Sequence, residues 1–272
     1  MDNRTRPLTV ISLGWGVQSW TLAAMVALKE LPPVDFAIHS DTTWERSATY
    51  VFAKQWAPWL EERGVKVVTV SDPECAGAVV VNCGGVFIPG YTLSDKGDRG
   101  QLRRQCSQRW KIQPVRRCIS AKLNGQKKTP GIVEQWIGYT LDEFQRAGDS
   151  KVKYIKNRFP LLEMNYTRGD CLAWLDRHDL PSPGKSACTF CPYHNRITWE
   201  NMKRENGQDW LQAVDVDARI RDRRPPYPLF VHPARVPLAE AVKIPEDYGY
   251  TQLALLDSDD FDAECDSGAC FL

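Results

Sequence analysis

The 272-residue sequence lacks any apolar run near the roughly 18 residues that a membrane-spanning helix needs. Its mean hydropathy is negative, and its first residues, Met-Asp-Asn-Arg-Thr-Arg, do not follow the pattern of a signal peptide. Charge of one sign is not in excess either, because 35 Lys and Arg face 34 Asp and Glu. We therefore expect a cytoplasmic protein without a membrane span, whose overall charge selects no class of partner.

The first glycine-rich stretch lacks both common phosphate-binding motifs. It reads Ser-Leu-Gly-Trp-Gly-Val-Gln-Ser over residues 12–19, without the Lys-Ser/Thr ending of a P-loop, and Ser19 stands where a dinucleotide fingerprint has its third glycine. A β-branched run precedes it and a run of helix formers follows, which predicts strand, turn and helix. Gly14 and Gly16 would let an anion approach the first amides of the helix. A tight turn that binds nothing fits the same pattern.

Further strands and helices alternate along the chain. Apolar runs at 34–40, 65–70 and 133–138 predict strands, and 46–63 predicts a helix that closes at Gly64. This order predicts an α/β fold with a doubly wound, mainly parallel sheet. We expect a nucleotide-binding α/β domain over residues 1–180. Residues 181–272 would form a Cys-x-x-Cys loop, a helical region with Trp199 and Trp210, and a tail, all packed on the same domain; 71–98 is loop-like.

The cysteines are numerous for a chain without an export signal. Nine of them in a reducing compartment favour metal binding or reactivity over disulfides. Cys188 and Cys191 are spaced as Cys-x-x-Cys, so both thiols can turn toward one ion, and zinc would need a fourth ligand, for which His194 is nearest in sequence. Two buried free thiols or a redox dithiol remain alternatives.

Charge is unevenly distributed along the chain. Residues 99–128 hold ten Lys and Arg and no acid, whereas residues 257–266 hold six acids and no base. The basic stretch favours an anionic ligand, although a solvated surface would look the same.

Several segments, taken in order, resemble the phosphoadenylyl-sulfate (PAPS) reductases and the wider adenine nucleotide α-hydrolase-like superfamily. Residues 14–19 resemble the pyrophosphatase loop Ser-Gly-Gly-x-Asp-Ser, with Gly14 for Ser, Trp15 for Gly and Gln18 for Asp. Residues 41–45 are similar to the start of an Asp-Thr-Gly-x-x-x-Glu signature. Residues 106–114 are similar to Cys-Cys-x-x-x-Lys-Val-x-Pro, with Gln105 in place of the first cysteine. Residues 138–146 resemble a substrate-phosphate segment from which Arg146 carries over.

The resemblance implies a set of site residues. An adenine nucleotide, ATP with Mg²⁺, would bind at the loop and at the end of the second strand, through Ser12, Gly14, Gly16, Gln18, Ser19, Asp41, Thr42 and Arg146. Gln18 weakens the Mg²⁺ expectation, because an amide is a poor substitute for a carboxylate. The resemblance also places Cys106 against Cys188 and Cys191, where they would ligate a [4Fe–4S] cluster with one open iron; zinc is the rival metal.

Catalytic candidates are Lys111 beside the cluster and two cysteines near the end of the chain. Residues 263–272 are faintly similar to the Glu-Cys-Gly ending of PAPS reductases, with Asp266 in place of Gly. Cys265 or Cys270 would then attack sulfur or complete a cluster, unless this is an acidic tail with incidental cysteines.

Three functions are compatible with this reading. In the first, ATP adenylates an acceptor oxygen and sulfur then displaces AMP. In the second, the protein reduces a sulfonucleotide; in the third, a non-catalytic chain binds a nucleotide or a nucleic acid. We expect the first, because Gln105 and Asp266 both weaken the reductase reading. The acceptor would be a small molecule, a nucleotide or a nucleic acid, and a homodimer is compatible with the sequence. Four basic residues would line the anionic end of the site, with Arg146 opposite and only a shallow salt dependence of binding: Arg103, Arg104, Arg109 and Lys111.

Overall fold

A computed structural model describes residues 6–72 and 86–243. Its main element is a five-stranded parallel sheet with the order β3-β2-β1-β6-β7. The strands are β1 (Leu8–Ser12), β2 (Phe36–Asp41), β3 (Val67–Ser71), β6 (Val133–Trp136) and β7 (Ile155–Arg158). In the middle of the sheet, Val10 of β1 is opposite Phe36 of β2 and Gln135 of β6. The predicted α/β class and parallel sheet are confirmed.

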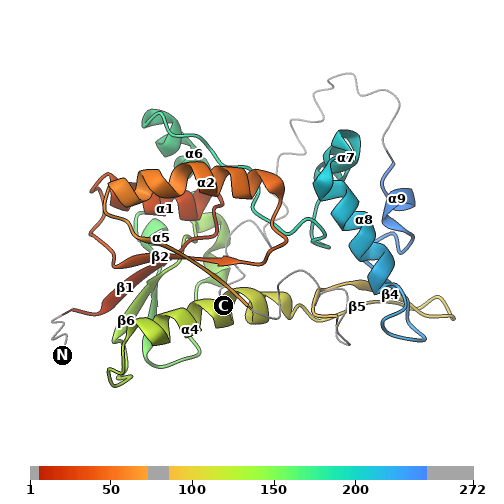
Figure 1. Ribbon diagram of the computed structural model, residues 1–272, viewed down its shortest axis with the longest axis horizontal. Coiled ribbons are helices and arrows are strands. Elements are labelled where there is room, and N and C mark those ends of the chain that lie inside the picture. Colours follow the sequence, from red (N-terminus) through yellow and green to blue (C-terminus); the bar gives the residue numbers. More distant parts are fainter. Residues whose placement is uncertain (1–5, 73–85, 244–272) are drawn as a thin grey trace.

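Helices cover both faces of this sheet. Helices α1 (Val17–Ala27) and α2 (Ser47–Glu62) lie on one face, and α4 (Gln113–Lys122) lies on the other (Figure 1). Because strand side chains alternate between faces, Ile11 packs in the core under α1 and α2, whereas Leu8 and Val10 pack in a second core under α4. The sheet is therefore doubly wound, as the alternating pattern predicts.

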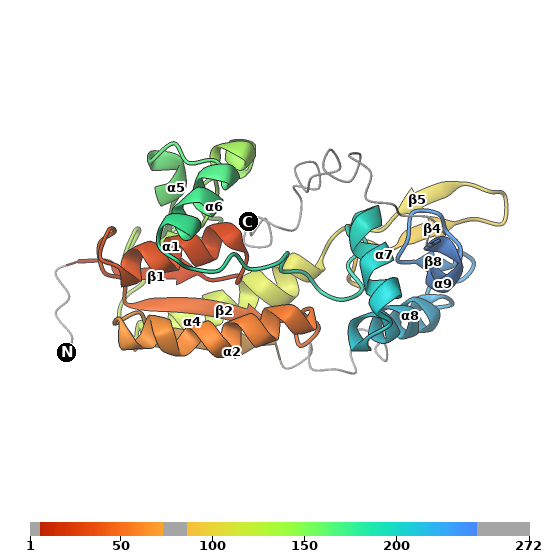
Figure 2. The same cartoon turned by 90° about the horizontal axis from the view of Figure 1, so that it is seen from above.

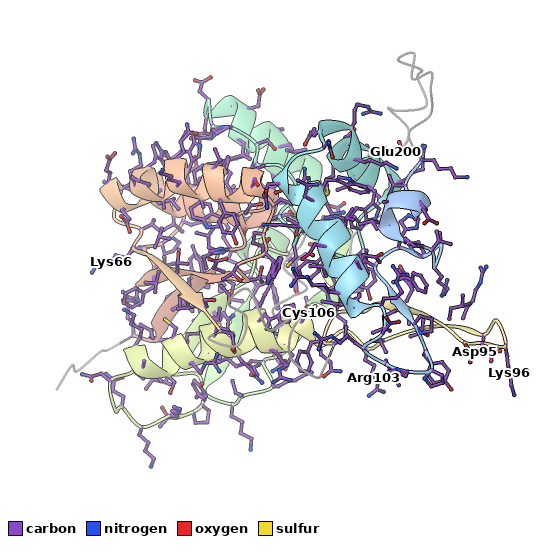
Figure 3. The ribbon with its side chains drawn as sticks, turned by 45° about the vertical axis from the view of Figure 1, so that its right-hand side comes forward. Lys66, Asp95, Lys96, Arg103, Cys106 and Glu200 are labelled. Atoms are coloured by element: carbon purple, nitrogen blue, oxygen red, sulfur yellow. The ribbon has the colours of Figure 1, made fainter. Side chains whose placement is uncertain are left out.

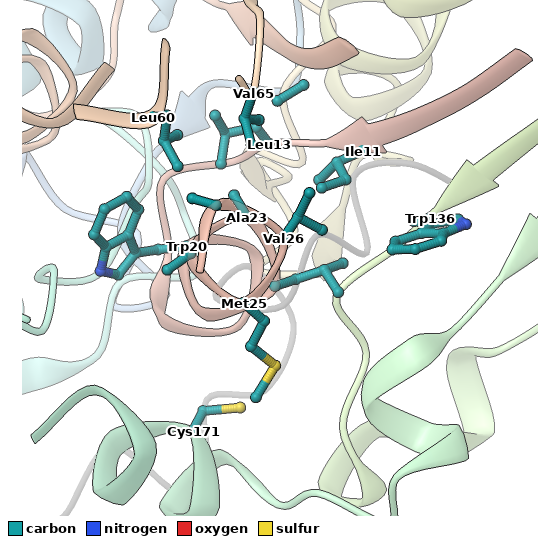
Figure 4. Close-up of a cluster of buried hydrophobic side chains, with 14 of the residues drawn as sticks. Ile11, Leu13, Trp20, Ala23, Met25, Val26, Leu60, Val65, Trp136 and Cys171 are labelled. Carbon is teal, nitrogen blue, oxygen red and sulfur yellow. The ribbon is translucent and has the colours of Figure 1, made fainter. Parts of the chain in front are cut away.

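Helix α1 is buried on almost every side. All of its residues except Ser19 are buried. Its own Trp20 and Met25 pack in one core with Cys171 of α6 (Arg168–Arg177) (Figure 4). The rings of Phe52 and Trp56 each lie 5.4 Å from the Trp20 ring. Two short helices, α5 (Pro160–Glu163) and α6, cover α1 from outside the sheet (Figure 2). This packing fixes the first turn of α1 relative to the sheet.

A third hydrophobic core lies beyond one end of the sheet (Figures 1 and 2). Helices α7 (Arg196–Glu205), α8 (Gln208–Ile220) and α9 (Leu238–Ala241) form it with a three-stranded antiparallel sheet of order β5-β4-β8. Those strands are β4 (Tyr91–Leu93), β5 (Arg99–Gln101) and β8 (Leu229–Phe230). The helices predicted around Trp199 and Trp210 are confirmed, and both rings belong to this core. The segment expected to be only loop contains β4.

Within residues 6–72 and 86–243, none of the helices combines the length and the apolar character required to cross a bilayer.

Candidate functional site

The loop over residues 14–19 lies at the point where the strand order of the parallel sheet reverses. Strand β1 has β2 on one side and β6 on the other, and open α/β sheets bind ligands beside the carboxyl ends of strands at such a point. Gly16 is the N-cap residue of α1. Trp15 adopts the left-handed φ of 58°, a conformation that glycine accepts more readily. Its ring is buried among Trp20 and Phe52, 6.2 Å from each ring, so tryptophan keeps the turn and adds to the core.

Hydroxyl groups hold this loop in place. Gly14 N–H donates to Ser19 Oγ (3.1 Å), and Ser19 Oγ donates to the carbonyl of Gly16 (3.2 Å). Below the loop, Ser12 Oγ accepts a hydrogen bond of 2.7 Å from Gln135 of β6. The loop is therefore preorganised next to the first amides of α1, which carry the positive end of the helix dipole.

Gln18 has a partner that the sequence did not reveal. Its side chain is buried, and its Oε1 accepts a hydrogen bond from Arg168 Nη1 at 3.3 Å. Arg168 is the first residue of α6, after the capping box of Thr167 and Asp170, and its backbone N–H donates to Asp142 Oδ2. A guanidinium thus lies at the start of α1, and the side-chain amide of Gln18 binds it. The only sequence signal for Arg168 is its place after a helix cap.

Gly138, which follows β6, packs directly on the first turn of α1. A Cβ at this position would lie 3.0 Å from Ser19 N and 3.1 Å from the carbonyl carbon of Gln18. We expect Gly138→Ala to displace this turn, because neither neighbour is a flexible side chain. Affinity for ATP should fall at least about tenfold, since overpacking of this kind typically costs about 1–3 kcal/mol. Isothermal titration measures this.

Gly148→Ala is the matched control, because that glycine is exposed and a Cβ there would have nothing within 4 Å. Equal affinity of Gly138→Ala and wild type would show that no ligand depends on the first turn of α1.

At the end of β2, Asp41 and Thr42 have different surroundings. Asp41 Oδ1 accepts hydrogen bonds from Thr43 N–H (2.7 Å) and from the Tyr50 hydroxyl (2.8 Å). Burial and this bond to Asp41 raise the pKa of Tyr50. Thr42 is fully buried; its Oγ1 donates to Glu45 Oε1 at 3.2 Å and lies 3.3 Å from Cys188 Sγ. Thr42 therefore connects the sheet edge to the Cys-x-x-Cys loop.

A buried ion pair lies between the sheet edge and the Cys-x-x-Cys loop. Lys111 Nζ is 3.1 Å from Glu45 Oε1, and the Glu45 side chain is only 1% exposed. Lys111 belongs to a π-helical turn, η1 (Ser107–Ile112), a geometry that often occurs at functional sites. The hydroxyl of Ser40 in β2 donates to the carbonyl of Trp110 (2.7 Å) and ties this turn to the sheet.

Ser186 joins the ion pair to the glycine loop. Its Oγ donates to the Gly14 carbonyl at 2.6 Å and lies 3.5 Å from Glu45 Oε2. The glycine loop, the buried carboxylate and the Cys-x-x-Cys loop are thereby parts of one site. Glu45 lies shortly after β2 and Ser186 precedes the cysteine motif, but neither position in the sequence indicates that the two meet.

The cysteine loop has the tight turn that its spacing predicts. Cys191 N–H donates to the Cys188 carbonyl at 3.0 Å, and Cys188 forms a β-bridge with Glu45. Burial, and then the charge of Glu45, raise the pKa of the Cys188 thiol well above its ordinary value, while Lys111 opposes them. Cys106 also acts electrostatically on Cys188, and both side chains pack against the hydrophobic core around Trp199 and Trp210.

His194, the nearest candidate for a fourth zinc ligand, is buried and uncharged. Its Nε2 lies 2.8 Å from the Cys188 carbonyl, to which it donates. Burial, and then the charge of Lys185, lower the pKa of His194 to about 3. This ring nitrogen therefore supports the cysteine turn through the backbone.

The fit of a metal can be judged from the donors present. Cys106 and Cys188 supply soft thiol ligands of the kind that iron–sulfur clusters and zinc prefer. Across residues 6–72 and 86–243, however, no three His, Cys, Asp or Glu side chains are grouped so that they could hold a metal ion. These residues therefore do not form a metal site as they stand, and the ligand set of Cys106, Cys188 and Cys191 stays a prediction. Cys265 and Cys270 lie outside the described residues.

The basic residues predicted to line the anionic end differ in their contacts. Arg146 Nη1 lies 2.7 Å from Glu143 Oε1, in an ion pair whose two side chains are 13% and 4% exposed. The Arg109 guanidinium lies 3.9 Å from the centre of the Phe87 ring, and that of Arg104 lies 5.5 Å from the Tyr193 ring. Lys111 contacts the buried carboxylate of Glu45, and Arg146 contacts that of Glu143.

Comparison with known proteins gives limited information. No protein-family model and no curated protein matches the sequence. Among solved structures, the chain is similar to a crystal structure of phosphoadenylyl-sulfate (PAPS) reductase from Candida auris in complex with phosphate, with 15% identity and a TM-score of 0.43. That match covers 66% of this chain and 76% of the other. What defines the class of this protein is its own sheet: an α/β fold with a polar site at the carboxyl ends of parallel strands.

Proposed function

We propose that this protein is an enzyme that transfers sulfur to an acceptor activated by an adenine nucleotide. The observation that carries the proposal is the contact of Ser186 with both the Gly14 carbonyl and Glu45. Through it, the glycine loop and a half-buried thiol with a cation nearby belong to one site. Nucleotide activation and sulfur chemistry need those two parts side by side.

Each part has a role in this proposal. The amides at the start of α1 would bind the phosphates of ATP, and Arg168 would supply positive charge beside them. The acceptor oxygen would attack the α-phosphorus, so that pyrophosphate leaves and AMP stays attached to the acceptor. A sulfur nucleophile would then displace AMP.

The thiol part of the site would hold the sulfur-bearing group. Lys111 would keep a positive charge near Cys188 and favour negative charge on sulfur as it develops. Glu45 fixes the position of Lys111 through their ion pair. A [4Fe–4S] cluster would supply an open iron for binding sulfide, and none of the roles above depends on it.

Reduction of a sulfonucleotide is the second candidate, with Cys265 or Cys270 as the nucleophile. The phosphate loop and the nearby thiols would serve that reaction as well. A nucleotide- or nucleic-acid-binding protein without catalysis is the third, and the bond of Gln18 to Arg168 favours it, because that bond occupies the amide oxygen that would face Mg²⁺.

The test is pyrophosphate release from ATP by anaerobically purified protein, with and without candidate acceptors. Acceptor-dependent release would support adenylation, and sulfur incorporation into the acceptor that is lost in Lys111→Met, but kept in a Lys66→Met control at the exposed residue before β3, would support sulfur transfer. Release of sulfite from a sulfonucleotide, without pyrophosphate release from ATP, would support the reductase instead.

Metal content gives a separate prediction. If Cys106, Cys188 and Cys191 ligate a cluster, anaerobic protein should be brown, contain acid-labile sulfide and bleach in air. Alanine at any of the three should remove most of the iron, whereas Cys118→Ala and Cys171→Ala should not. Stoichiometric zinc without sulfide would reject the cluster. Metal analysis and the visible spectrum decide between them.

A further inference from the structure

A cavity of about 530 Å³ lies between the stretch that follows β5 and the turn between α8 and β8. It shares no lining residue with the glycine loop. Three arginines line it, Arg103, Arg223 and Arg224. Its remaining described lining residues are amides or apolar side chains, with no acid among them: Val86, Gln101, Leu102, Gln105 and Leu229. This arginine cavity is therefore a concentration of positive charge.

The chemistry of the arginine cavity fits phosphate groups. Guanidinium groups bind phosphate oxygens through paired N–H donors, and the amides of Gln101 and Gln105 offer further hydrogen bonds. Arg103 and Arg224 are exposed, and nearby in the chain Tyr227 is 44% exposed. A site for a small molecule usually encloses its ligand. Exposed cations, with the exposed Tyr227 close to Arg224 in the chain, instead suit an extended strand with phosphates and stacking bases.

The position of the arginine cavity relates it to the thiols. Gln105 lines the cavity, and the next residue, Cys106, packs against the same hydrophobic core as Cys188. Consecutive Cα atoms are only about 3.8 Å apart, and the backbone N–H groups of both residues donate to the Phe87 carbonyl, at 3.0 and 2.9 Å. Arg103 and Cys106 lie along the same short segment (Figure 3). A ligand in the cavity would thus lie beside the backbone that carries Cys106.

We propose that the arginine cavity binds the phosphate backbone of a single-stranded nucleic acid, and that this strand is the acceptor of the sulfur. The identification as acceptor rests on the proposed function, whereas the binding does not. We therefore expect the affinity for the strand to fall steeply as salt rises, in place of the shallow dependence expected from the sequence. The reason is that the cavity groups Arg103 with Arg223 and Arg224, two arginines from a distant part of the chain.

The experiment uses the full chain and a fluorescein-labelled single-stranded RNA of twelve nucleotides and mixed sequence. Fluorescence anisotropy at several salt concentrations should give a slope of log K against log salt near about −2, because each phosphate neutralised on a single strand contributes about −0.7. Alanine at Arg103, Arg223 and Arg224 together should weaken binding at least about tenfold in 0.1 M salt and flatten that slope.

The control removes three exposed cations elsewhere, one on α2, one directly after α2 and one directly before β3: Lys54→Ala, Arg63→Ala and Lys66→Ala. The loss of formal charge is identical, and Lys66 lies on the far side of the molecule from Arg103 (Figure 3). Affinity of this control should stay within about twofold of wild type. The proposal would be overturned if both triple variants weakened binding equally or if the RNA did not bind at all. It would also be overturned if pyrophosphate, at an equal concentration of phosphate groups, displaced the strand.

Alkylation of the cysteines, mapped by mass spectrometry, tests the position of the strand. Bound RNA should slow alkylation of Cys106 several-fold and leave Cys118 of α4 unchanged; unchanged alkylation of Cys106 would overturn the placement beside the thiols. If RNA binds as expected but no acceptor elicits pyrophosphate release, the proposed function fails and the arginine cavity stands as a binding site. If pyrophosphate is released with a small acceptor and RNA does not bind, only the cavity assignment fails.

Discussion

Replacement of Lys111 by methionine should lower the free energy of unfolding by about 3–5 kcal/mol. The substitution keeps most of the side-chain volume but leaves the Glu45 carboxylate, 1% exposed, without its cation at 3.1 Å. Removing one partner of a buried pair typically costs this much, because a buried charge is left uncompensated. Urea unfolding, followed by circular dichroism, measures the change.

A double-mutant cycle separates this cause from simple loss of packing. Glu45→Gln with Lys111→Met removes both charges, so the double variant should be more stable than Lys111→Met alone. Lys66→Met, at an exposed position, should change the free energy of unfolding by less than about 0.5 kcal/mol. A loss below 1 kcal/mol in Lys111→Met would mean that the ion pair is not buried as described.

The first half of the fold follows from local sequence patterns. Strand β1 and helix α1 come from an apolar run and a run of helix formers on either side of the glycine turn. Gly64 ends α2 with a φ of +86°, the conformation for which glycine is suited. Strand β7 was missed because Ile-Lys-Asn-Arg, at the edge of the sheet, has only one apolar side chain. Edge strands bury less surface, so their pattern is weak.

The site was predicted in its parts but not in its connections. Glycine spacing indicated the loop, and Cys-x-x-Cys spacing indicated the turn at Cys188, since both signals are local. The Glu45–Lys111 pair and the bond of Arg168 to Gln18 join residues far apart in the sequence, and no local period encodes such contacts. The grouping of Arg103 with Arg223 is of the same kind. The packing of side chains in the hydrophobic cores decides which of these residues meet.

Gly16→Val should abolish measurable nucleotide binding, with a loss of at least about a hundredfold in affinity, or about 2.7 kcal/mol. Gly16 has a φ of −89° and a ψ of 171°, values that valine also adopts, so the backbone of the loop should keep its shape. The loss would come from the branched side chain, which would crowd the phosphate at the first amides of α1. Isothermal titration with ATP in the presence and absence of Mg²⁺ measures it.

Gly207→Val is a closely matched control for this change. Gly207 is the N-cap residue of α8, has a φ of −84° and a ψ of −173°, and a Cβ there would have nothing within 4 Å. Both variants place a valine in an N-cap position, at a cost of about 1 kcal/mol in helix stability, and they differ in that Gly16 is buried and Gly207 is exposed. Only Gly16→Val should lose the nucleotide, because only α1 begins at the carboxyl end of a parallel strand where the strand order reverses. If the two variants titrate alike, the nucleotide does not bind at this loop, and the assignment of the anion site to α1 is wrong.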